Sequence, residues 1–281
     1  MMAAWHVDRR GTPDPRWFPV EALSEGERGP FVQRIAAGNL GAAVIPGALP
    51  PEACAAWAAR LDGGEHPVAP TRFAREFEAW SFGPCLDQSE GDVNGYLARV
   101  EPFERALRGA APGCDVIDRV LAALGRLAAA LPIERPAAPD GRPYGLLTLR
   151  GLPPGGLIPP HCENEQLPRR AYDALRPRLD TSVLMSFYVT VRPADQGGEL
   201  SVHDLGVDAI GARVRHGHSV LSGEVDRSPA VRLWFEPGTL VIFDGGRRFH
   251  QVLPVRGARQ RWTLGGFAAL SSDRSRLFVW A

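Results

Sequence analysis

The sequence contains no lysine, and all 32 of its basic residues are arginine. Without lysine the protein cannot form a Schiff base with a carbonyl substrate, attach pyridoxal phosphate or bind phosphate through a P-loop lysine. An excess charge of either sign is absent too, because 32 acidic residues bring the formal net charge to zero. Proteins that attract nucleic acids or membrane surfaces usually carry a basic patch. We therefore expect neither nucleic acid nor a membrane as a partner.

Cysteine is scarce, and long hydrophobic runs are missing. Cys54, Cys85, Cys114 and Cys162 form no C-x-x-C pair, and their wide spacing indicates neither a zinc site nor the disulfide framework of a small secreted protein. The most apolar stretch, residues 120–133, is interrupted by an arginine and is too short to cross a bilayer. The first residues lack the apolar core of a signal peptide. These features predict a cytoplasmic protein.

The first half of the chain shows the apolar spacing of helices. Helices are expected over residues 52–61, 92–107 and 115–131, the second of them interrupted by Pro102. Residues 1–30, rich in proline, glycine and charge, are expected to follow the surface with little regular structure.

After about residue 140, short β-branched or aromatic runs recur between glycines and prolines, as in a sandwich or barrel. The candidate strands are residues 144–150, 157–161, 182–191, 199–202, 231–235, 239–243, 248–253 and 260–268, with an earlier strand at residues 42–45. Residues 163–181 are expected to form an insertion of mixed helical character. This pattern predicts a mainly β fold with helices, in which N-terminal helices pack on the major sheet of a double-stranded β-helix (jelly roll). We expect one domain over residues 1–281, with an N-terminal extension and helices in residues 1–140 and the jelly-roll core in residues 141–281.

The strongest local signal is the tripeptide His161-Cys162-Glu163 at the end of an apolar run. Residues two apart on a strand face the same side, so His161 and Glu163 can reach one metal ion while Cys162 points away as a small buried residue. His250, which follows the strand at residues 239–243, is suited to supply a third ligand. Two histidines and one carboxylate form the facial triad of non-haem iron(II) oxygenases, which leaves coordination positions for cosubstrate and dioxygen.

Two arginines follow His250 near the start of the last expected strand. Arg259, Arg261 and Thr263 would share one face of that strand. A buried arginine can bind a carboxylate through two parallel hydrogen bonds, and a hydroxyl two residues away can assist it. This combination suits 2-oxoglutarate, which is a dicarboxylate.

On these residues the chain resembles the iron(II)/2-oxoglutarate-dependent dioxygenase superfamily, and its sequence pattern is most similar to the prolyl-hydroxylase-like branch. The matching segments are His161-x-Glu163, residues 182–191 leading to Gly197-Gly198-Glu199-Leu200, residues 237–243, His250 and Arg261-x-Thr263. The resemblance implies a jelly-roll core and iron(II) held by the two histidines and Glu163. It also implies that 2-oxoglutarate chelates the metal and pairs with Arg261.

The cosubstrate contacts have alternatives. The interval from His250 to Arg261 is long for the family, so Arg259 is a second candidate anchor for 2-oxoglutarate. We favour Arg261, because a spacer and Thr263 follow it as in the family.

Polar residues on neighbouring strands are further candidates. Ser186 and Tyr188 lie on the mixed face of the strand at residues 182–191, which should line the barrel, and either could donate a hydrogen bond to 2-oxoglutarate. Candidate substrate contacts are Arg150, Asn164 and Glu165.

The resemblance implies an enzyme that uses iron(II), 2-oxoglutarate and dioxygen (O2) to oxidise an unactivated carbon. Hydroxylation is the default outcome, and desaturation and ring closure are related ones. Halogenation is disfavoured, because halogenating relatives have a small residue where this chain has Glu163. The neutral charge and compact length favour a small-molecule substrate, such as an amino acid or a biosynthetic intermediate, over nucleic acid. A peptide or carrier-bound substrate stays open. The sequence does not indicate an oligomeric state.

Three alternatives remain from the sequence. His216-Gly217-His218, followed by Glu224, is near a cupin metal motif on the same fold, although its spacing differs. A zinc-dependent enzyme could use two histidines and one glutamate, and a noncatalytic jelly-roll binding protein would make the triad incidental. The arginine and hydroxyl on the last strand argue against both. Two further polar residues, His203 and Asp204, are expected at the surface.

Overall fold

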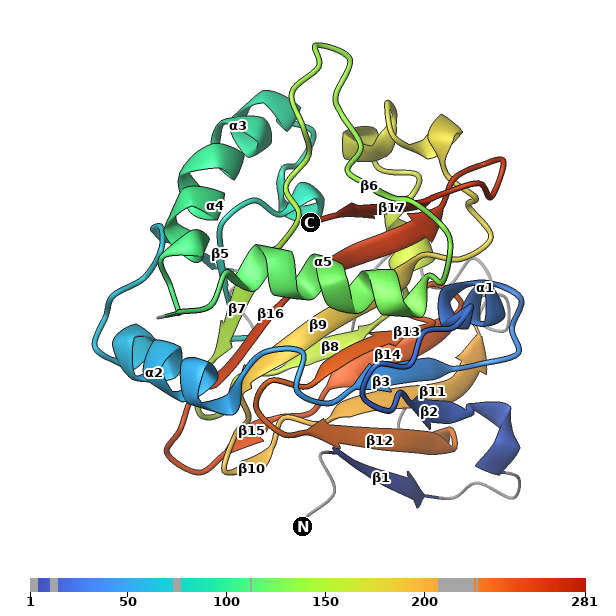
Figure 1. Ribbon diagram of the computed structural model, residues 1–281. Helices are drawn as coiled ribbons and strands as arrows, with labels where there is room; N and C mark the ends of the chain where they lie inside the picture. Colours follow the sequence, from blue (N-terminus) through green and yellow to red (C-terminus); the bar gives the residue numbers. More distant parts are fainter. Residues whose placement is uncertain (1–4, 11–14, 73–76, 112, 207–224, 226) are drawn as a thin grey trace.

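Two β-sheets and a layer of helices make up the structure (Figure 1). The computed structural model describes residues 5–10, 15–72, 77–111, 113–206, 225 and 227–281. Within these residues, no helix is both long and apolar enough to span a membrane. The predicted mainly β architecture with added helices is confirmed.

The larger sheet has ten strands, and its central path runs β2-β3-β13-β9-β16-β7-β5-β4. Neighbouring strands of this sheet run antiparallel, except in the β2–β3 and β17–β6 pairs, which are parallel. Its strands are β2 (Val20–Ala22), β3 (Ala42–Ile45), β4 (Pro70–Arg72), β5 (Trp80–Phe82), β6 (Ile133–Glu134), β7 (Thr148–Leu152), β9 (Met185–Arg192), β13 (Leu240–Phe243), β16 (Arg261–Leu270) and β17 (Leu277–Trp280).

The smaller sheet has the order β1-β12-β11-β14-β8, and all its pairs are antiparallel. Its strands are β1 (Trp5–Arg10), β8 (Ile158–His161), β11 (Leu200–Gly206), β12 (Ala230–Phe235) and β14 (Arg248–Val252). A separate two-stranded ribbon pairs β10 (Gln196–Gly197) with β15 (Val255–Arg256). The eight strands expected after residue 140 are all present, with ends shifted by a few residues.

Alternation along the strands of the larger sheet creates two apolar layers. All four residues of β13 are buried. Leu240 and Ile242 pack in the cluster that includes the helices, whereas Val241 and Phe243 pack with residues of β11 and β12 from the smaller sheet. Side chains of a strand point alternately to its two faces, so the second face of the larger sheet lines the space between the sheets.

The outer face of the larger sheet is covered by helices α1 (Phe31–Ala36), α2 (Pro51–Asp62), α4 (Val100–Arg108) and α5 (Val116–Leu127), and α5 lies across its strands (Figure 1). Helix α3 (Val93–Ala98) packs instead in a second apolar cluster, with Phe267 and Trp280. The helical stripe of α5 that was expected from the sequence is buried against the sheet, with Ile117, Val120 and Leu124 at its centre.

The structure corrects three expectations about secondary structure. Residues 5–10 form β1, which pairs along the whole length of β12, so part of the N-terminal segment is regular. The helix expected over residues 92–107 breaks at Arg99, and Pro102 lies in the first turn of α4, where a missing N–H leaves no bond unmade. Helix α5 ends at Leu127, and Ala129 with a φ of 54° turns the chain away.

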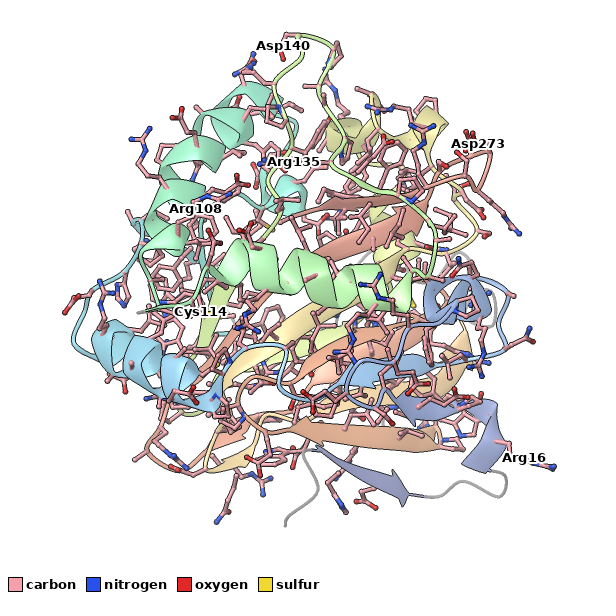
Figure 2. All side chains as sticks on the ribbon, in the orientation of Figure 1. Arg16, Arg108, Cys114, Arg135, Asp140 and Asp273 are labelled. Carbon is pink, nitrogen blue, oxygen red and sulfur yellow. The ribbon has the colours of Figure 1, made fainter. Side chains whose placement is uncertain are left out.

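The start of α5 is held by its N-cap residue. Asp115 accepts hydrogen bonds from the backbone N–H groups of Ile117 at 3.0 Å and Asp118 at 3.2 Å. Arg108, labelled in Figure 2 at the end of α4, donates to the same carboxylate. The hydrogen bonds and the arginine hold the pKa of Asp115 below its usual range against the opposing effect of burial.

Asp115→Ala should lower the free energy of unfolding by about 1 kcal/mol, because the first turn of α5 loses its cap. Urea unfolding followed by circular dichroism measures this loss. Asp118→Ala is the matched control on the same helix, since its exposed side chain caps no backbone group in the described structure, and it should change the stability by no more than about 0.5 kcal/mol. Equal losses in the two variants would contradict the capping role.

Candidate metal centre

His161, Glu163 and His250 come together at the junction of two neighbouring strands. His161 is the last residue of β8 and stands opposite His250 in β14. Glu163 follows as the first residue of the 3-10 helix η3 (Glu163–Gln166). One ligand atom from each of the three lies within 4.8 Å of the others, and no other such group of three or more histidine, cysteine or acidic residues occurs in the described part of the chain.

The two imidazoles point the same nitrogen toward Glu163. Nε2 of His161 lies 3.6 Å from Glu163 Oε1, and Nε2 of His250 lies 3.5 Å from the same oxygen. The Nδ1 atoms lie 2.7 Å from the carbonyl oxygen of Pro159 and 3.2 Å from that of Arg248. Each Nδ1 therefore carries the proton and donates it to a carbonyl, which leaves the Nε2 lone pair for a metal ion.

Charges in this cluster favour a cation. Burial opposes the charge on Glu163, but hydrogen bonds and charge interactions with His161 and His250 hold the pKa of that carboxyl well below its usual range. Burial and the neighbouring His161 lower the pKa of His250. Burial also works against protonation of His161, but its hydrogen bond and charge interaction with Glu163 raise its pKa. A buried carboxylate between two imidazoles is thus available to a divalent ion, which would displace a proton from the pair.

The donor set fits iron(II). Two imidazole nitrogens and one carboxylate oxygen converge from two paired strands and the turn that follows one of them, as in the facial triad of non-haem iron sites. Glu163 and His250 are each only 3% exposed. The same-face geometry expected for His161 and Glu163 is therefore present.

Neighbouring groups fix the carboxylate of Glu163. Ser186 Oγ donates to Oε1 at 2.7 Å, and Gln166 Nε2 donates to Oε2. The backbone N–H of Glu163 donates to the carbonyl of Gly245 at 2.8 Å. A Cβ at Gly245 would lie only 2.7 Å from Ser186 Oγ and 3.0 Å from Glu163 Cγ, so this turn requires glycine for close approach rather than for a special φ.

A cavity extends from the triad between the two sheets. Its polar lining includes Arg150, Ser186, Tyr188, Arg261 and Thr263. Its apolar lining consists of Ile158, Phe187, Leu200, Phe243, Val252 and Phe267, together with the backbone of Gly265 and Gly266. The cavity therefore brings most of the predicted site residues into one space.

Arg261 is buried beside this cavity with 6% of its surface exposed. Its Nη1 donates to Thr263 Oγ1 at 3.4 Å, and its guanidinium carbon lies 5.3 Å from the centre of the Tyr188 ring. Burial lowers the pKa of Arg261 and raises the pKa of Tyr188 to about 12. Within the described residues, no carboxylate lies at ion-pair distance from Arg261.

Arg259 lies elsewhere. It precedes β16 in a turn in which the backbone N–H groups of Ala258 and Arg259 donate to Asp195 at 2.9 and 3.1 Å. Its exposed side chain pairs with the same carboxylate. The expectation that Arg259 shares a strand face with Arg261 is wrong, because the strand begins only at Arg261.

The three candidate substrate residues separate in the structure. Arg150 lines the cavity from β7, opposite Thr263 of β16. Asn164 lies in η3 and is held by the residues just before β9. Its amide donates to the Ser182 carbonyl at 3.2 Å and accepts from the Leu184 N–H at 2.8 Å. Glu165 accepts from the backbone N–H of Cys162 at 3.4 Å. Only Arg150 of these three lies among the residues that line the cavity.

Other expectations have mixed outcomes. Cys162 is buried beside Phe249, as expected, and burial strongly raises the pKa of its thiol. His203 is 4% exposed and lies within hydrogen-bond distance of Ser201 and Ser228, so its expected surface position is wrong. Asp204 is exposed, and residues 207–224, which contain the cupin-like motif, lie outside the described residues.

Sequence reasoning missed the groups behind Glu163. Gln166 and Tyr172 are buried, and with Asp87 they form a chain of hydrogen bonds that ends at Glu163. No spacing rule connects these three residues, which come from three different 3-10 helices. Gly245 had a visible signal, since two glycines precede His250 in a turn.

Residues 16–281 match the model of a protein family described as carrier-protein-independent halogenase WelO5. The chain belongs to this family. A comparison with curated protein sequences finds no match. Among solved structures, the chain is similar to an N-substituted L-amino acid dioxygenase from Burkholderia ambifaria AMMD, with 16% identity over 88% of this chain and 89% of that chain and a TM-score of 0.58. The complex of that enzyme with alpha-KG (2-oxoglutarate) gives a TM-score of 0.54 at the same identity and coverage.

Membership of the WelO5 family confirms the predicted superfamily, and the solved structures confirm the predicted fold. The protein is an iron(II)/2-oxoglutarate-dependent enzyme, and its triad fits the metal. The family's description names a halogenase, but in this family member the carboxylate of Glu163 lies between the two histidines. That carboxylate bears directly on the reaction that the chain performs.

His161→Ala and His250→Ala should each abolish the binding of one iron(II), because two remaining ligands hold a divalent ion poorly. Anaerobic titration with iron(II) measures the binding. His216→Ala and His218→Ala are the controls for the cupin alternative and should keep the affinity of the unchanged protein. Loss of metal in either control variant, together with retention in His161→Ala, would move the site to the cupin motif.

Proposed function

We propose that the protein hydroxylates a small molecule, with iron(II) held by His161, Glu163 and His250 and 2-oxoglutarate anchored by Arg261. The observation that carries this proposal is that the triad and a buried arginine line one cavity. Iron(II) bound with 2-oxoglutarate supplies the activation of dioxygen that oxidises an unactivated carbon and releases succinate and carbon dioxide.

The surroundings of Arg261 support its role as the anchor. Burying a guanidinium without a carboxylate at ion-pair distance is costly, and among the described residues Glu199 acts on Arg261 only through a longer-range charge interaction. A carboxylate of 2-oxoglutarate would accept two parallel hydrogen bonds from the guanidinium. Thr263 and Tyr188 flank the guanidinium, and their hydroxyls could add to the contact.

Glu163 favours hydroxylation over halogenation. A halide needs a metal position that no protein ligand fills, and the carboxylate of Glu163 lies at that position between the two imidazoles. Ser186 and Gln166 both hold the carboxylate in place. Desaturation and ring closure are alternative outcomes of the same oxidation.

The lining of the cavity favours a substrate with a carboxylate, such as an amino acid or a similar metabolite. Glu163 is the one acidic residue among the described residues of the lining. Besides Arg261, Arg150 is the one arginine among the described residues of the lining, and a guanidinium can donate hydrogen bonds to a substrate carboxylate. The similar solved dioxygenase acts on N-substituted L-amino acids, which carry a carboxylate.

We further propose that residues 1–281 act as one domain, because strands of the first 140 residues join both sheets of the core. The four cysteines are buried free thiols, which supports action in a reducing compartment such as the cytoplasm.

A panel of free and N-substituted amino acids, with their uncharged amides, tests the proposed reaction. In the presence of iron(II), 2-oxoglutarate and dioxygen, carboxylate-bearing members should stimulate succinate formation and gain one oxygen atom, as detected by mass spectrometry. Arg150→Gln should raise the KM for these members with little change for the amides. Chlorinated products from the unchanged protein in chloride buffer would contradict hydroxylation as the outcome.

Arg261→Ala should weaken 2-oxoglutarate binding by about two orders of magnitude or more, because losing one partner of a buried charge pair costs about 2 to 5 kcal/mol. Succinate formation against 2-oxoglutarate concentration measures the effect, and iron(II) binding should persist. Arg261→Lys should rescue only in part, since an ammonium cannot form the planar pair of bonds.

Arg259→Ala is the matched control, because it removes an arginine two residues away that is exposed and paired with Asp195. It should leave the 2-oxoglutarate dependence unchanged. A defect confined to this control would transfer the anchoring role to Arg259.

A further inference from the structure

A chain of buried hydrogen bonds leads away from Glu163. Gln166 Nε2 donates to Glu163 Oε2, and Gln166 Oε1 lies 3.0 Å from the hydroxyl of Tyr172. The same hydroxyl lies 2.9 Å from Asp87 Oδ1. Gln166 is 6% exposed and Tyr172 is fully buried, so water does not compete for these bonds.

The chain connects three short 3-10 helices that are distant in the sequence. Asp87 lies in η2 (Leu86–Gln88), Gln166 in η3 and Tyr172 in η4 (Arg170–Tyr172). The last two belong to the insertion at residues 163–181, which otherwise contributes no side chain to the cavity beyond Glu163. The insertion therefore places polar side chains directly behind the metal carboxylate.

The direction of the bonds fixes the amide of Gln166. Its NH2 group must face Glu163, because a carboxylate only accepts hydrogen bonds. Its carbonyl oxygen then faces Tyr172 and needs the single proton of that hydroxyl. Asp87 Oδ1 lies within hydrogen-bond distance of the same hydroxyl, and burial together with the charge of Glu163 raises the pKa of Asp87 to about 6, so a larger share of this carboxyl is protonated than of an ordinary aspartate.

The two oxygens of Glu163 are thus unequal. Oε1 faces Nε2 of both histidines at 3.5 and 3.6 Å, whereas Oε2 is occupied by Gln166. Ser186 Oγ also donates to Oε1 at 2.7 Å. Without the amide, this single hydrogen bond would have to orient the carboxylate, which could then rotate more freely. Outer partners that orient a metal ligand generally contribute to metal affinity.

We propose that Gln166, supported by Tyr172 and Asp87, is a positioning residue that holds Glu163 with Oε1 directed at the metal. This inference rests on the metal site proposed above. It gives the insertion at residues 163–181 a role in the reaction, namely to fix the ligand that also excludes a halide.

Binding of cobalt(II) and iron(II) to Gln166→Met and Tyr172→Phe tests the proposal without turnover. Gln166→Met keeps the length of the side chain and removes the amide, and it should weaken metal binding by between about 10- and 100-fold. Tyr172→Phe removes only the hydroxyl and should produce a smaller loss in the same direction. The visible absorption of bound cobalt(II), which depends on ligand geometry, should change in both variants.

Tyr144→Phe is the matched control, because Tyr144 is a buried tyrosine of the same apolar cluster as Tyr172 and its hydroxyl has no hydrogen-bond partner in the described structure. It should leave metal affinity and the cobalt spectrum unchanged. Thermal unfolding of each metal-free variant separates positioning from damage to the fold, since a positioning role lowers metal affinity at unchanged melting temperature.

Two results would overturn the inference. The first is unchanged metal affinity in both Gln166→Met and Tyr172→Phe while His161→Ala loses the metal, which would leave the proposed function intact. The second is an affinity loss in these variants that merely follows a lower melting temperature. If the unchanged protein itself bound no metal, the proposed function would fail instead.

Discussion

The metal centre depends on one pairing between backbones, that of β8 with β14. In its register, His161 stands opposite His250. Because side chains alternate along a strand, a slip of one residue would turn His250 to the other face of the sheet and bring Phe249 to the site. Contacts on that other face resist the slip, since Phe249 packs there against Cys162, the residue between the two ligands of the tripeptide. The apolar side of these strands therefore sets the geometry of their polar side.

Side-chain directions that follow from short-period patterns could be predicted from the sequence. Alternation in β9 correctly placed Ser186 and Tyr188 between the sheets, and the spacing of His161 and Glu163 correctly placed both on one side. These predictions succeed because a strand imposes its own geometry on neighbouring residues. The Arg-x-Thr pattern favoured Arg261 over Arg259 from the sequence alone. That Arg259 lies outside the strand follows from the position at which β16 begins, which a turn around Asp195 decides and which no local pattern reveals.

Features that depend on distant partners were not predictable. Strand β1 forms because β12 offers an edge to pair with, and the residues of β1 show no strong strand pattern of their own. The burial of His203 depends on Ser228 and Gln251, which other strands and turns bring to it. The hydrogen-bond chain from Glu163 to Asp87 likewise joins segments that are separated in sequence by helices α3 to α5 and strands β6 to β8. In each case the missing information is tertiary packing, which is absent from any window of sequence.

If Arg261 anchors 2-oxoglutarate as proposed above, its burial links the stability of the protein to its cosubstrate. A guanidinium withdrawn from water without a carboxylate lowers the stability of the folded state, and 2-oxoglutarate supplies that carboxylate only to the folded chain. Ligand binding to the folded state alone stabilises it by about 2.7 kcal/mol when the free ligand is at about 100 times its dissociation constant. The fraction of folded enzyme, and with it the resistance to proteolysis, would then rise with the supply of 2-oxoglutarate. The proposed anchor would in that way also make the lifetime of the enzyme depend on its cosubstrate.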